Sequence, residues 1–524
     1  MRAWTRWLVV GLAVAGCRAA EPPRPNVLFI AVDDLRPALG AYGDSVAITP
    51  NIDALARSGV TFLQAHVQQA VCNPSRASLM TGLRPDSLRV WDLDTDFRTT
   101  VPGVVTLPQL FRQHGYFATV VGKIYHNIFP DTLSWSEPEM KIPGFPYDPD
   151  AVYHHRDNLA IQEARKAAAI AAGQADRHVD ALGFWYLKAN ATESVDLPDS
   201  VYYDGAQTNY AVRKLAQLAA RSEPFFFGVG YYRPHLPFNA PRKYWDLYDR
   251  DAIPLAPNPS VPRGAPEMAI NNMRELRGYA DFADVAHPFK GSVTVAEARR
   301  LKHGYYASVS YIDAQIGRLL GALDSLGLTR NTIVVLWGDH GYKLGEHNSW
   351  AKMTNHLIDT RAPLIIRAPG QGVPGTRLGQ MVEFVDIYPT VAELAGVPRP
   401  DHLQGLSVVP LLTDSTRPWK TATFSQFLRH GIWVGLDSTP YMGYSIRTER
   451  YRYARWENWE TKRLAGRELY DHQTDPDENR NLADDPAMAA TLDSLEARRL
   501  AGWRAARPSL PAGGGPATKT ANDR

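Results

Sequence analysis

Two apolar runs of strand length, each followed by carboxylates, constrain the fold of this chain more than any other feature. Residues 26–32 read NVLFIAV and lead directly into Asp33 and Asp34, and residues 331–337 read NTIVVLW and end shortly before Asp339. A continuous apolar run of this length suits a strand that is buried on both faces, as in a parallel sheet. Because parallel strands end at the same edge of a sheet, where open α/β folds bind ligands, we expect these carboxylates to lie together.

The size and composition of the chain fit a soluble protein with more than one packed unit. At 524 residues it exceeds the usual limit of a single core, so we expect at least two units. Hydrophobic residues make up 44% and charged residues 21%, which is ordinary for a globular protein. A net charge of +2 gives no basic field for nucleic acid, so any anion must be recognised by a local cluster.

The pattern of apolar residues changes along the chain. Residues 305–326 have the spacing of an amphipathic helix and precede the second buried strand. Beyond Leu412, residues 423–433 and 443–456 alternate or run short, which is typical of antiparallel strands. Residues 492–504 indicate a last helix. The chain therefore predicts a large α/β unit followed by a smaller α+β unit.

The N-terminal residues indicate export. Arg2 and Arg6 precede a short apolar run, which is too short for an ordinary membrane span. The run ends VAGC at Cys17, and this resembles a bacterial lipobox, in which the cysteine becomes the lipidated first residue of the mature protein. An ordinary signal peptide with an incidental cysteine is the alternative. We expect a lipoprotein signal over residues 1–17 and a proline-rich tether over 18–25.

Cys72 is one of only two cysteines, and because the other, Cys17, lies at the end of the export signal, Cys72 has no partner in the mature chain for an internal disulfide. A free thiol in an exported protein is either a small buried hydrophobic group or a functional one. Arg76 follows one helical turn later, so a helix that begins near Cys72 would place both residues on one face. The cysteine would then lie at the positive end of the helix, which suits attack on an anionic ester.

The residues around Cys72 resemble a known signature. They read CNPSR from Cys72 to Arg76, the pattern C-x-P-S-R, and continue as LMTGLRP over residues 79–85. This resembles the signature of the type I sulfatases. In that family a dedicated enzyme oxidises the cysteine to formylglycine, an aldehyde, so the resemblance implies a formylglycine-generating enzyme as a maturation partner.

Further motifs extend the resemblance to about residues 25–490. Lys123 and His126 match the family's G-K-x-x-H, and His235 lies in a Pro-His-x-Pro turn after an apolar run. The block from Asp339 to Lys352, with DHG, GEH and WAK, resembles the iduronate-2-sulfatase group. The resemblance implies catalytic roles for six residues: Cys72, Arg76, Lys123, His126, His235 and Lys352.

The same resemblance implies a metal site. Three aspartates at strand ends would form an oxygen-rich site for a hard divalent ion, and the family precedent is Ca²⁺. A zinc phosphatase would show more histidine ligands. The implied ligands are Asp33, Asp34, Cys72, Asp339 and His340.

The resemblance also implies a fold and a reaction. The fold is that of the alkaline phosphatase superfamily, an α/β protein with a large mixed or parallel sheet sandwiched by helices. We expect a catalytic domain over residues 26–412, a C-terminal subdomain with a short antiparallel sheet over 413–507, and a disordered tail over 508–524. The protein would act outside the cytoplasm, periplasmic or on the cell surface, and touch the membrane only through its lipid.

The expected activity is hydrolysis of sulfate esters in sulfated glycans. Hydrated formylglycine would attack sulfur, and its second hydroxyl would then expel sulfate and restore the aldehyde. Arg76, Lys123 and Lys352 would hold the sulfate oxygens, His235 would protonate the leaving alcohol, and His126 would act as the base. The alternatives are a sulfatase for another polysaccharide, a phosphate or phosphonate ester hydrolase, and a catalytically silent glycan-binding lipoprotein.

The sugar specificity should depend on loops that carry no recognisable motif. These are residues 131–200 and 250–295. Trp91, Asp96 and Arg98 are candidates for a glycan cleft.

Lipid anchoring gives the first testable prediction. Replacing Cys17 by Ser removes the only thiol that a lipid could modify in the leader, so the protein should leave the membrane fraction or remain unprocessed. Fractionation with a radiolabelled fatty acid measures both effects. Unchanged fractionation, with no label on the wild-type protein, would contradict the anchor.

Overall fold

The computed structural model describes residues 24–146, 149–180 and 183–508. The predicted signal peptide with Cys17, most of the tether and nearly all of the predicted tail lie outside the described residues. Within the described ranges, no helix is long and apolar enough to cross a membrane.

A seven-stranded mixed sheet forms the centre of the large unit. Every neighbouring pair is parallel except the two that involve β10. The strands lie in the order β11 (Thr376–Glu383), β2 (Val60–His66), β10 (Leu364–Arg367), β7 (Thr332–Gly338), β1 (Asn26–Val32), β5 (Phe225–Tyr231) and β3 (Phe117–Gly122). All residues of β1 and β7 are buried, as the two apolar runs predict.

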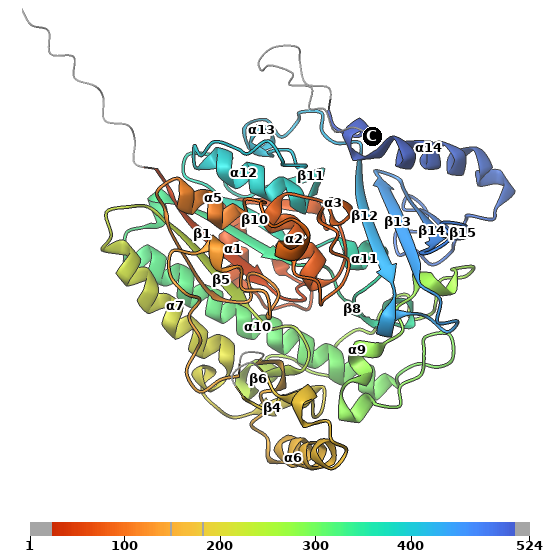
Figure 1. The fold of residues 1–524 in the computed structure, drawn as a ribbon, viewed down its shortest axis with the longest axis horizontal. Coiled ribbons are helices and arrows are strands. Elements are labelled where there is room, and N and C mark those ends of the chain that lie inside the picture. Colours follow the sequence, from red (N-terminus) through yellow and green to blue (C-terminus); the bar gives the residue numbers. More distant parts are fainter. Residues whose placement is uncertain (1–23, 147–148, 181–182, 509–524) are drawn as a thin grey trace, which may run out of the picture.

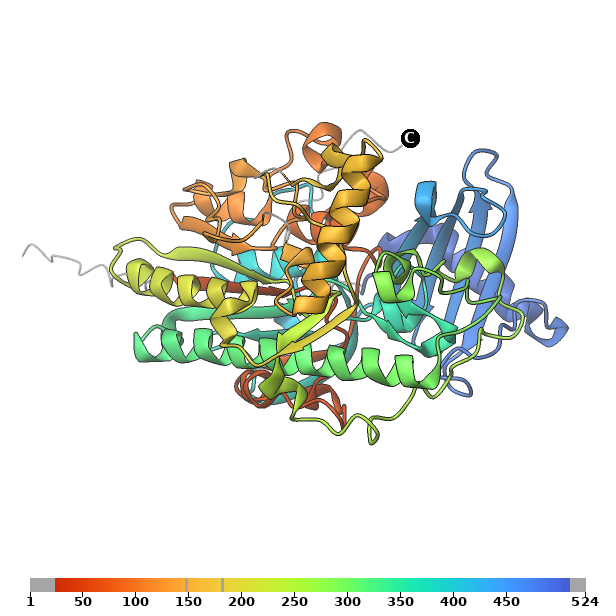
Figure 2. The same cartoon turned by 90° about the horizontal axis from the view of Figure 1, so that it is seen from below.

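Helices cover both faces of this sheet (Figures 1 and 2). One hydrophobic cluster joins the sheet to α1 (Pro50–Ser58), α7 (Tyr203–Ala219) and α10 (Val295–Ser325). The other joins it to α2 (Cys72–Thr81), α5 (Leu107–Gln113) and α12 (Ile387–Leu394). The helix predicted from residue 305 begins earlier because Thr294 and Glu297 form a capping box at its N-terminus.

The smaller C-terminal sheet is antiparallel and lies beside the large one (Figure 1). It contains β12 (Ala422–Arg429), β13 (Tyr441–Thr448), β14 (Tyr451–Asn458) and β15 (Leu464–Asp471), and α14 (Ala489–Ala505) packs against it. The predicted run 443–456 is two strands, because Thr448 and Tyr451 bond across a tight hairpin. The α/β fold with a small C-terminal sheet is confirmed, and the domain limits stay a prediction.

Further elements surround these two sheets. They are β4 (Thr192–Val195), β6 (Phe238–Pro241), β8 (Lys343–Leu344), β9 (Trp350–Ala351), α3 (Pro85–Leu88), α4 (Phe97–Thr100), α6 (Arg156–Ala171), α8 (Arg242–Trp245), α9 (Arg274–Arg277), α11 (Leu357–Thr360) and α13 (Val409–Thr413).

A buried ionic network links the two sheets. Glu383, at the end of β11, accepts two hydrogen bonds from Arg84, at 2.9 and 2.6 Å, and one from Lys420 at 2.8 Å. Its Oε1 also accepts the backbone N–H of Phe424 in β12 at 3.0 Å. Burial alone would raise the pKa of Glu383, but Arg84 and Lys420 hold it well below the ordinary value. The carboxylate therefore stays charged and fastens β12 to the large sheet.

Removing this charge should destabilise the fold. Glu383→Gln leaves the buried Arg84 without its counterion, whereas Lys420 keeps Asp386 at 2.7 Å, and we expect a loss of about 3–5 kcal/mol in urea unfolding. Because the folded pKa of Glu383 is depressed, its contribution is present above its unfolded pKa and is lost as the pH falls. Glu393 pairs with Arg399 at the surface, so Glu393→Gln is a matched control that should cost under about 1 kcal/mol. Equal effects of the two substitutions would contradict this account.

Candidate active site

Two neighbouring strands place the predicted metal ligands at one edge of the large sheet. β1 and β7 are parallel, and Val32 lies opposite Gly338, so the residues that follow them emerge side by side. The backbone N–H of Asp34 donates to Asp339 Oδ1 at 3.0 Å. Asp34 itself has a left-handed backbone with φ 58°, which turns the chain sharply at the end of β1.

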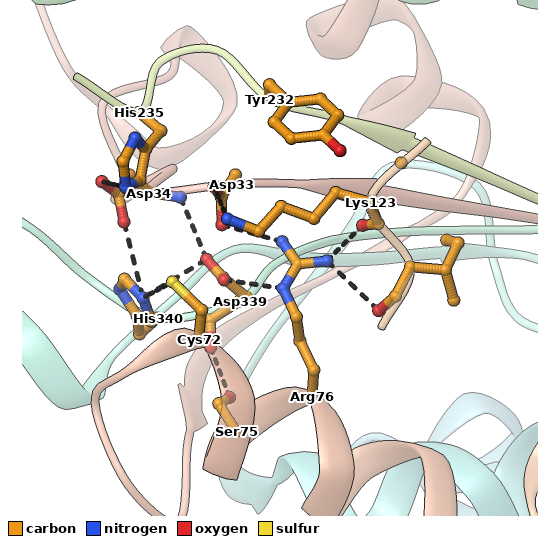
Figure 3. A network of polar contacts seen from close by, with 12 residues as sticks. Asp33, Asp34, Cys72, Ser75, Arg76, Lys123, Tyr232, His235, Asp339 and His340 are labelled. Atoms are coloured by element: carbon orange, nitrogen blue, oxygen red, sulfur yellow. Dashed lines mark hydrogen bonds and ion pairs between the residues drawn. The ribbon is translucent and has the colours of Figure 1, made fainter. Parts of the chain in front are cut away.

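The helix α2 begins at Cys72, as the spacing of Cys72 and Arg76 predicts, and both side chains are buried (Figure 3). Arg76 donates from Nε to Asp339 Oδ2 and from Nη2 to Asp33 Oδ1, each at 2.9 Å. Its Nη1 donates to the carbonyl oxygens of Lys123 and Ile124. Four of its five N–H groups are thus used within the chain, so Arg76 holds the two aspartates in place.

Cys72 faces the same cluster. Its Sγ lies 3.4 Å from His340 Nε2, while His340 Nδ1 contacts the carbonyl oxygen of Gly341 at 2.9 Å. The contact at Nδ1 assigns the ring proton to that nitrogen and leaves Nε2 free to accept. Burial and the nearby Asp33 carboxylate raise the pKa of the Cys72 thiol well above its ordinary value. An unmodified Cys72 is therefore a poor nucleophile.

Two lysines and a histidine close the cluster. Lys123 Nζ donates to Asp33 Oδ2 at 2.5 Å, and Lys352 Nζ donates to Asp34 Oδ2 at 2.9 Å. His235 lies on the far side of Asp34, with Nε2 3.8 Å from Asp34 Oδ2. The structure thus brings these sequence-predicted residues into one buried group.

His126 lies at the margin of this group. It lines a small cavity together with Lys123, Asn127 and Tyr232. Its Nδ1 is buried and makes no hydrogen bond to any described residue. The structure therefore places His126 beside Lys123, at the margin of the cluster.

The cluster has the composition of a divalent metal site. Ligand atoms of Asp34, Cys72 and His340, and separately of Asp33, Cys72 and Asp339, lie within 4.8 Å of one another. Asp34 Oδ1 is buried and makes no hydrogen bond within the part of the chain that the structure describes, although the Lys352 ammonium lies 2.9 Å from it. The donors are mainly carboxylate oxygens, which suit a hard ion.

The charges support the same conclusion. Three cationic groups and four carboxylates converge: Arg76, Lys123, Lys352, Asp33, Asp34, Asp339 and Glu275. Burial and the carboxylates of Glu275, Asp33 and Asp339 raise the pKa of Asp34 well above its ordinary value, despite Lys352. A bound divalent cation would relieve this excess of negative charge.

The sequence motifs missed several residues of the site. Glu275 accepts from Lys352 at 2.8 Å, and Ser75 Oγ donates to the carbonyl oxygen of Asp339 at 2.5 Å. Tyr232 faces Lys123, whose Nζ lies 5.6 Å from the ring centre. Glu275 lies in the segment 250–295, which carries no motif, so only its place in a proposed specificity loop pointed to it.

The proposed cleft residues have different surroundings. Arg98 uses all five N–H groups on Asp131, Gln109 and nearby carbonyl oxygens. Asp96 caps the N-terminus of α4. Both therefore hold the loop together, and Arg98 has no N–H group left for a sugar. Trp91 is partly exposed and contacts Trp459 edge-on at 5.4 Å, so it stays a candidate.

Comparison with known proteins agrees with this geometry. A family model described as Sulfatase matches residues 25–397, and the C-terminal model of N-sulphoglucosamine sulphohydrolase matches residues 345–505. The chain belongs to the sulfatase family. It is a sulfuric ester hydrolase with the fold of the alkaline phosphatase superfamily.

Curated relatives cover nearly the whole sulfatase chain. Iduronate 2-sulfatase of Mus musculus is 34% identical over 541 residues, which cover 90% of this chain and 93% of that protein. The enzyme of Homo sapiens is 33% identical over 528 residues, covering 88% and 91%. Among solved structures, the phosphonate monoester hydrolase of Silicibacter pomeroyi shares the fold, with a TM-score of 0.70, 24% identity, and 92% and 96% coverage.

Divalent cations should stabilise this sulfatase. Adding Ca²⁺ to chelator-treated protein should raise the melting temperature, since the bound cation offsets the repulsion between the carboxylates. Asp339→Asn removes one charge and should reduce this rise. The surface substitution Glu393→Gln is the control and should keep the full rise. An unchanged melting temperature after exhaustive chelation would rule out the metal site.

Proposed function

We propose that this sulfatase removes sulfate from sulfated glycans in a reaction like that of iduronate 2-sulfatase. The observation that carries the proposal is the position of Cys72. It begins α2 at the sheet edge, beside three aspartates and within reach of two lysines. The mouse and human relatives are iduronate 2-sulfatases, which supports a sulfated iduronate as the substrate class.

We propose that residue 72 becomes the nucleophile only after maturation. A formylglycine-generating enzyme would convert Cys72 to the aldehyde, whose hydrate supplies both the attacking hydroxyl and the hydroxyl that later expels sulfate. The raised pKa of the unmodified thiol fits a residue that serves as a precursor. Ca²⁺, held by Asp33, Asp34, Asp339 and His340, would supply positive charge beside the nucleophile and the sulfate oxygens.

The remaining side chains would bind the sulfate group and transfer protons. Lys123 and Lys352 each hold one aspartate and can turn an N–H toward a sulfate oxygen, because an ammonium has three donors. Arg76 keeps one N–H and adds its charge. His235 faces the cluster from the opposite side to Cys72 and donates a proton to the leaving alcohol. His126, with its free Nδ1, is the base that takes a proton from the remaining hydroxyl.

The charge balance favours a sulfate ester over a phosphate ester. With three cationic groups, four carboxylates and a divalent ion, the site keeps one positive charge. A sulfate monoester carries one negative charge, whereas a phosphate monoester approaches two near neutral pH. A phosphate ester hydrolase is therefore the second candidate. A phosphonate monoester carries one negative charge, as a sulfate monoester does, so a phosphonate ester hydrolase is a further candidate, supported by the shared fold of the phosphonate monoester hydrolase.

The remaining assignments are also proposals. A lipoprotein anchor at Cys17 would hold the enzyme on the periplasmic or outer face of a bacterial membrane, near polymeric substrate. Residues 26–412 would form the catalytic domain and 413–507 the C-terminal subdomain. A catalytically silent glycan-binding lipoprotein is the alternative if residue 72 stays a cysteine.

Two substitutions test the mechanism. Cys72→Ala removes the precursor of the nucleophile, so sulfate release should be lost for every substrate. His235→Ala removes only a proton donor, so it should impair a sulfated disaccharide by about 100-fold or more and an aryl sulfate much less, because a phenolate leaves without a proton. Ion chromatography of released sulfate measures both.

Mass spectrometry of the peptide that contains residue 72 serves as the control. It must show the aldehyde in the wild-type protein and in His235→Ala before rates are compared. Full activity of Cys72→Ala would overturn the sulfatase mechanism. Equal losses on both substrates in His235→Ala would leave that histidine a binding role only.

A further inference from the structure

One short segment of the 250–295 loop holds Lys352 at both ends. Asn271 Nδ2 donates to the carbonyl oxygens of Trp350 and Lys352, at 2.9 and 2.8 Å. At the other end of the lysine, Nζ donates to Glu275 Oε1 at 2.8 Å. Asn271 and Glu275 therefore contact the backbone and the ammonium group of the same residue.

The backbone around Lys352 needs such support. Ala351 and Met353, on either side, have left-handed conformations with φ 70° and 82°. For residues other than glycine, such conformations cost on the order of 1–3 kcal/mol each and persist only where the surroundings hold them. The bonds from Asn271, and the bond from the Met353 N–H to the Ala70 carbonyl oxygen at 3.1 Å, supply that support.

Glu275 also faces His235. The Oε1 atom that accepts from Lys352 lies 3.3 Å from His235 Nε2. His235 Nδ1 contacts the carbonyl oxygen of Leu236 at 2.6 Å, so the ring is held from its other side as well. One carboxylate oxygen thus sets the distance between the lysine that would hold sulfate and the histidine that would protonate the leaving group.

Glu275 also has a second carboxylate oxygen, Oε2, which does not pair with Lys352. Oε2 is buried and makes no hydrogen bond to any described residue, and the side chain is only 8% exposed. An anionic group beside an anionic substrate opposes binding through its charge alone. We therefore expect the Glu275 carboxylate to act through the positions of Lys352 and His235 rather than through its charge.

We propose that Asn271 and Glu275 are positioning residues, which together fix Lys352 and His235 beside each other at the scissile S–O bond. This inference rests on the proposed function, because it assumes an ester that is bound by Lys352 and protonated by His235. Asn271 fixes the backbone of Lys352, and Glu275 fixes its ammonium group and the direction of His235 Nε2. Neither residue touches the substrate.

A positioning role has a kinetic signature that a binding role lacks. Glu275→Gln removes a negative charge near an anionic substrate, so KM should stay constant or fall. The misplaced proton donor should lower kcat by about 10- to 100-fold on a sulfated iduronate disaccharide. With 4-nitrophenyl sulfate, whose phenolate leaves without a proton, kcat should change much less. Asn271→Ala should lower kcat on both substrates, since it displaces Lys352 itself.

Glu267 offers a matched control on the same loop. It accepts the backbone N–H of Leu436 at 3.0 Å and contacts His287 at 3.1 Å, away from Lys352 and His235. Glu267→Gln should leave the ratio of the two rates unchanged. Glu275→Asp keeps the charge but retracts it, so it should lower the disaccharide rate with little change in melting temperature.

The outcomes separate this inference from the proposed function. If the wild-type protein, with formylglycine present, releases sulfate from neither substrate, the proposed function fails. A crystal structure of Glu275→Gln then decides the inference on its own, because an unmoved His235 ring would overturn it, whereas Lys352 keeps its bond to Asp34. If the wild-type protein is active, a raised KM with unchanged kcat, or equal losses on both substrates in Glu275→Gln, would also overturn it.

Discussion

The contact on which the rest of the site depends is the bridge from Arg76 to Asp33 and Asp339. These carboxylates follow different strands, and the arginine belongs to a helix on one face of the sheet. Burying three such groups costs several kcal/mol per ion before pairing, so the bridge is stable only while all three are present. By fixing α2 against the ends of β1 and β7, it also fixes Cys72, which shares the first turn of the helix. The position of the nucleophile precursor thus depends on this ionic bridge as well as on the apolar packing of α2 against the sheet.

Much of the fold and the centre of the site could be predicted from the sequence because they obey short-range rules. A buried parallel strand is recognisable as a continuous apolar run, and the residue after it must lie at the carboxyl edge. The spacing of Cys72 and Arg76 specifies a shared helical face, and the structure confirms that helix. The roles assigned to these residues came from resemblance to a family and stay proposals, whereas their convergence is confirmed.

Other features could not be predicted, because they depend on contacts between distant segments. Arg98 looked available for a sugar until the structure paired it with Asp131. Asn271 and Glu275 lie in a segment without periodicity, and α9, which contains Glu275, is a single turn. Their partners lie about eighty positions away, and no pattern of residue types encodes that pairing.

The two classes of residue also differ in how they are held. Asp33, Asp34, Asp339 and His340 extend from the ends of central strands, whereas Lys352 lies in an irregular segment between two left-handed residues. Side chains at strand ends are positioned accurately by the sheet, whereas the position of a residue on a strained loop depends on the contacts that support it. It follows that the half of the site nearest the nucleophile is fixed by the sheet. The half that meets the leaving group is fixed by the loop around residues 271–275. Because that loop contacts both Lys352 and His235, changes in its sequence would alter one sulfate contact and the proton donor together, while the strand-borne aspartates stay in place.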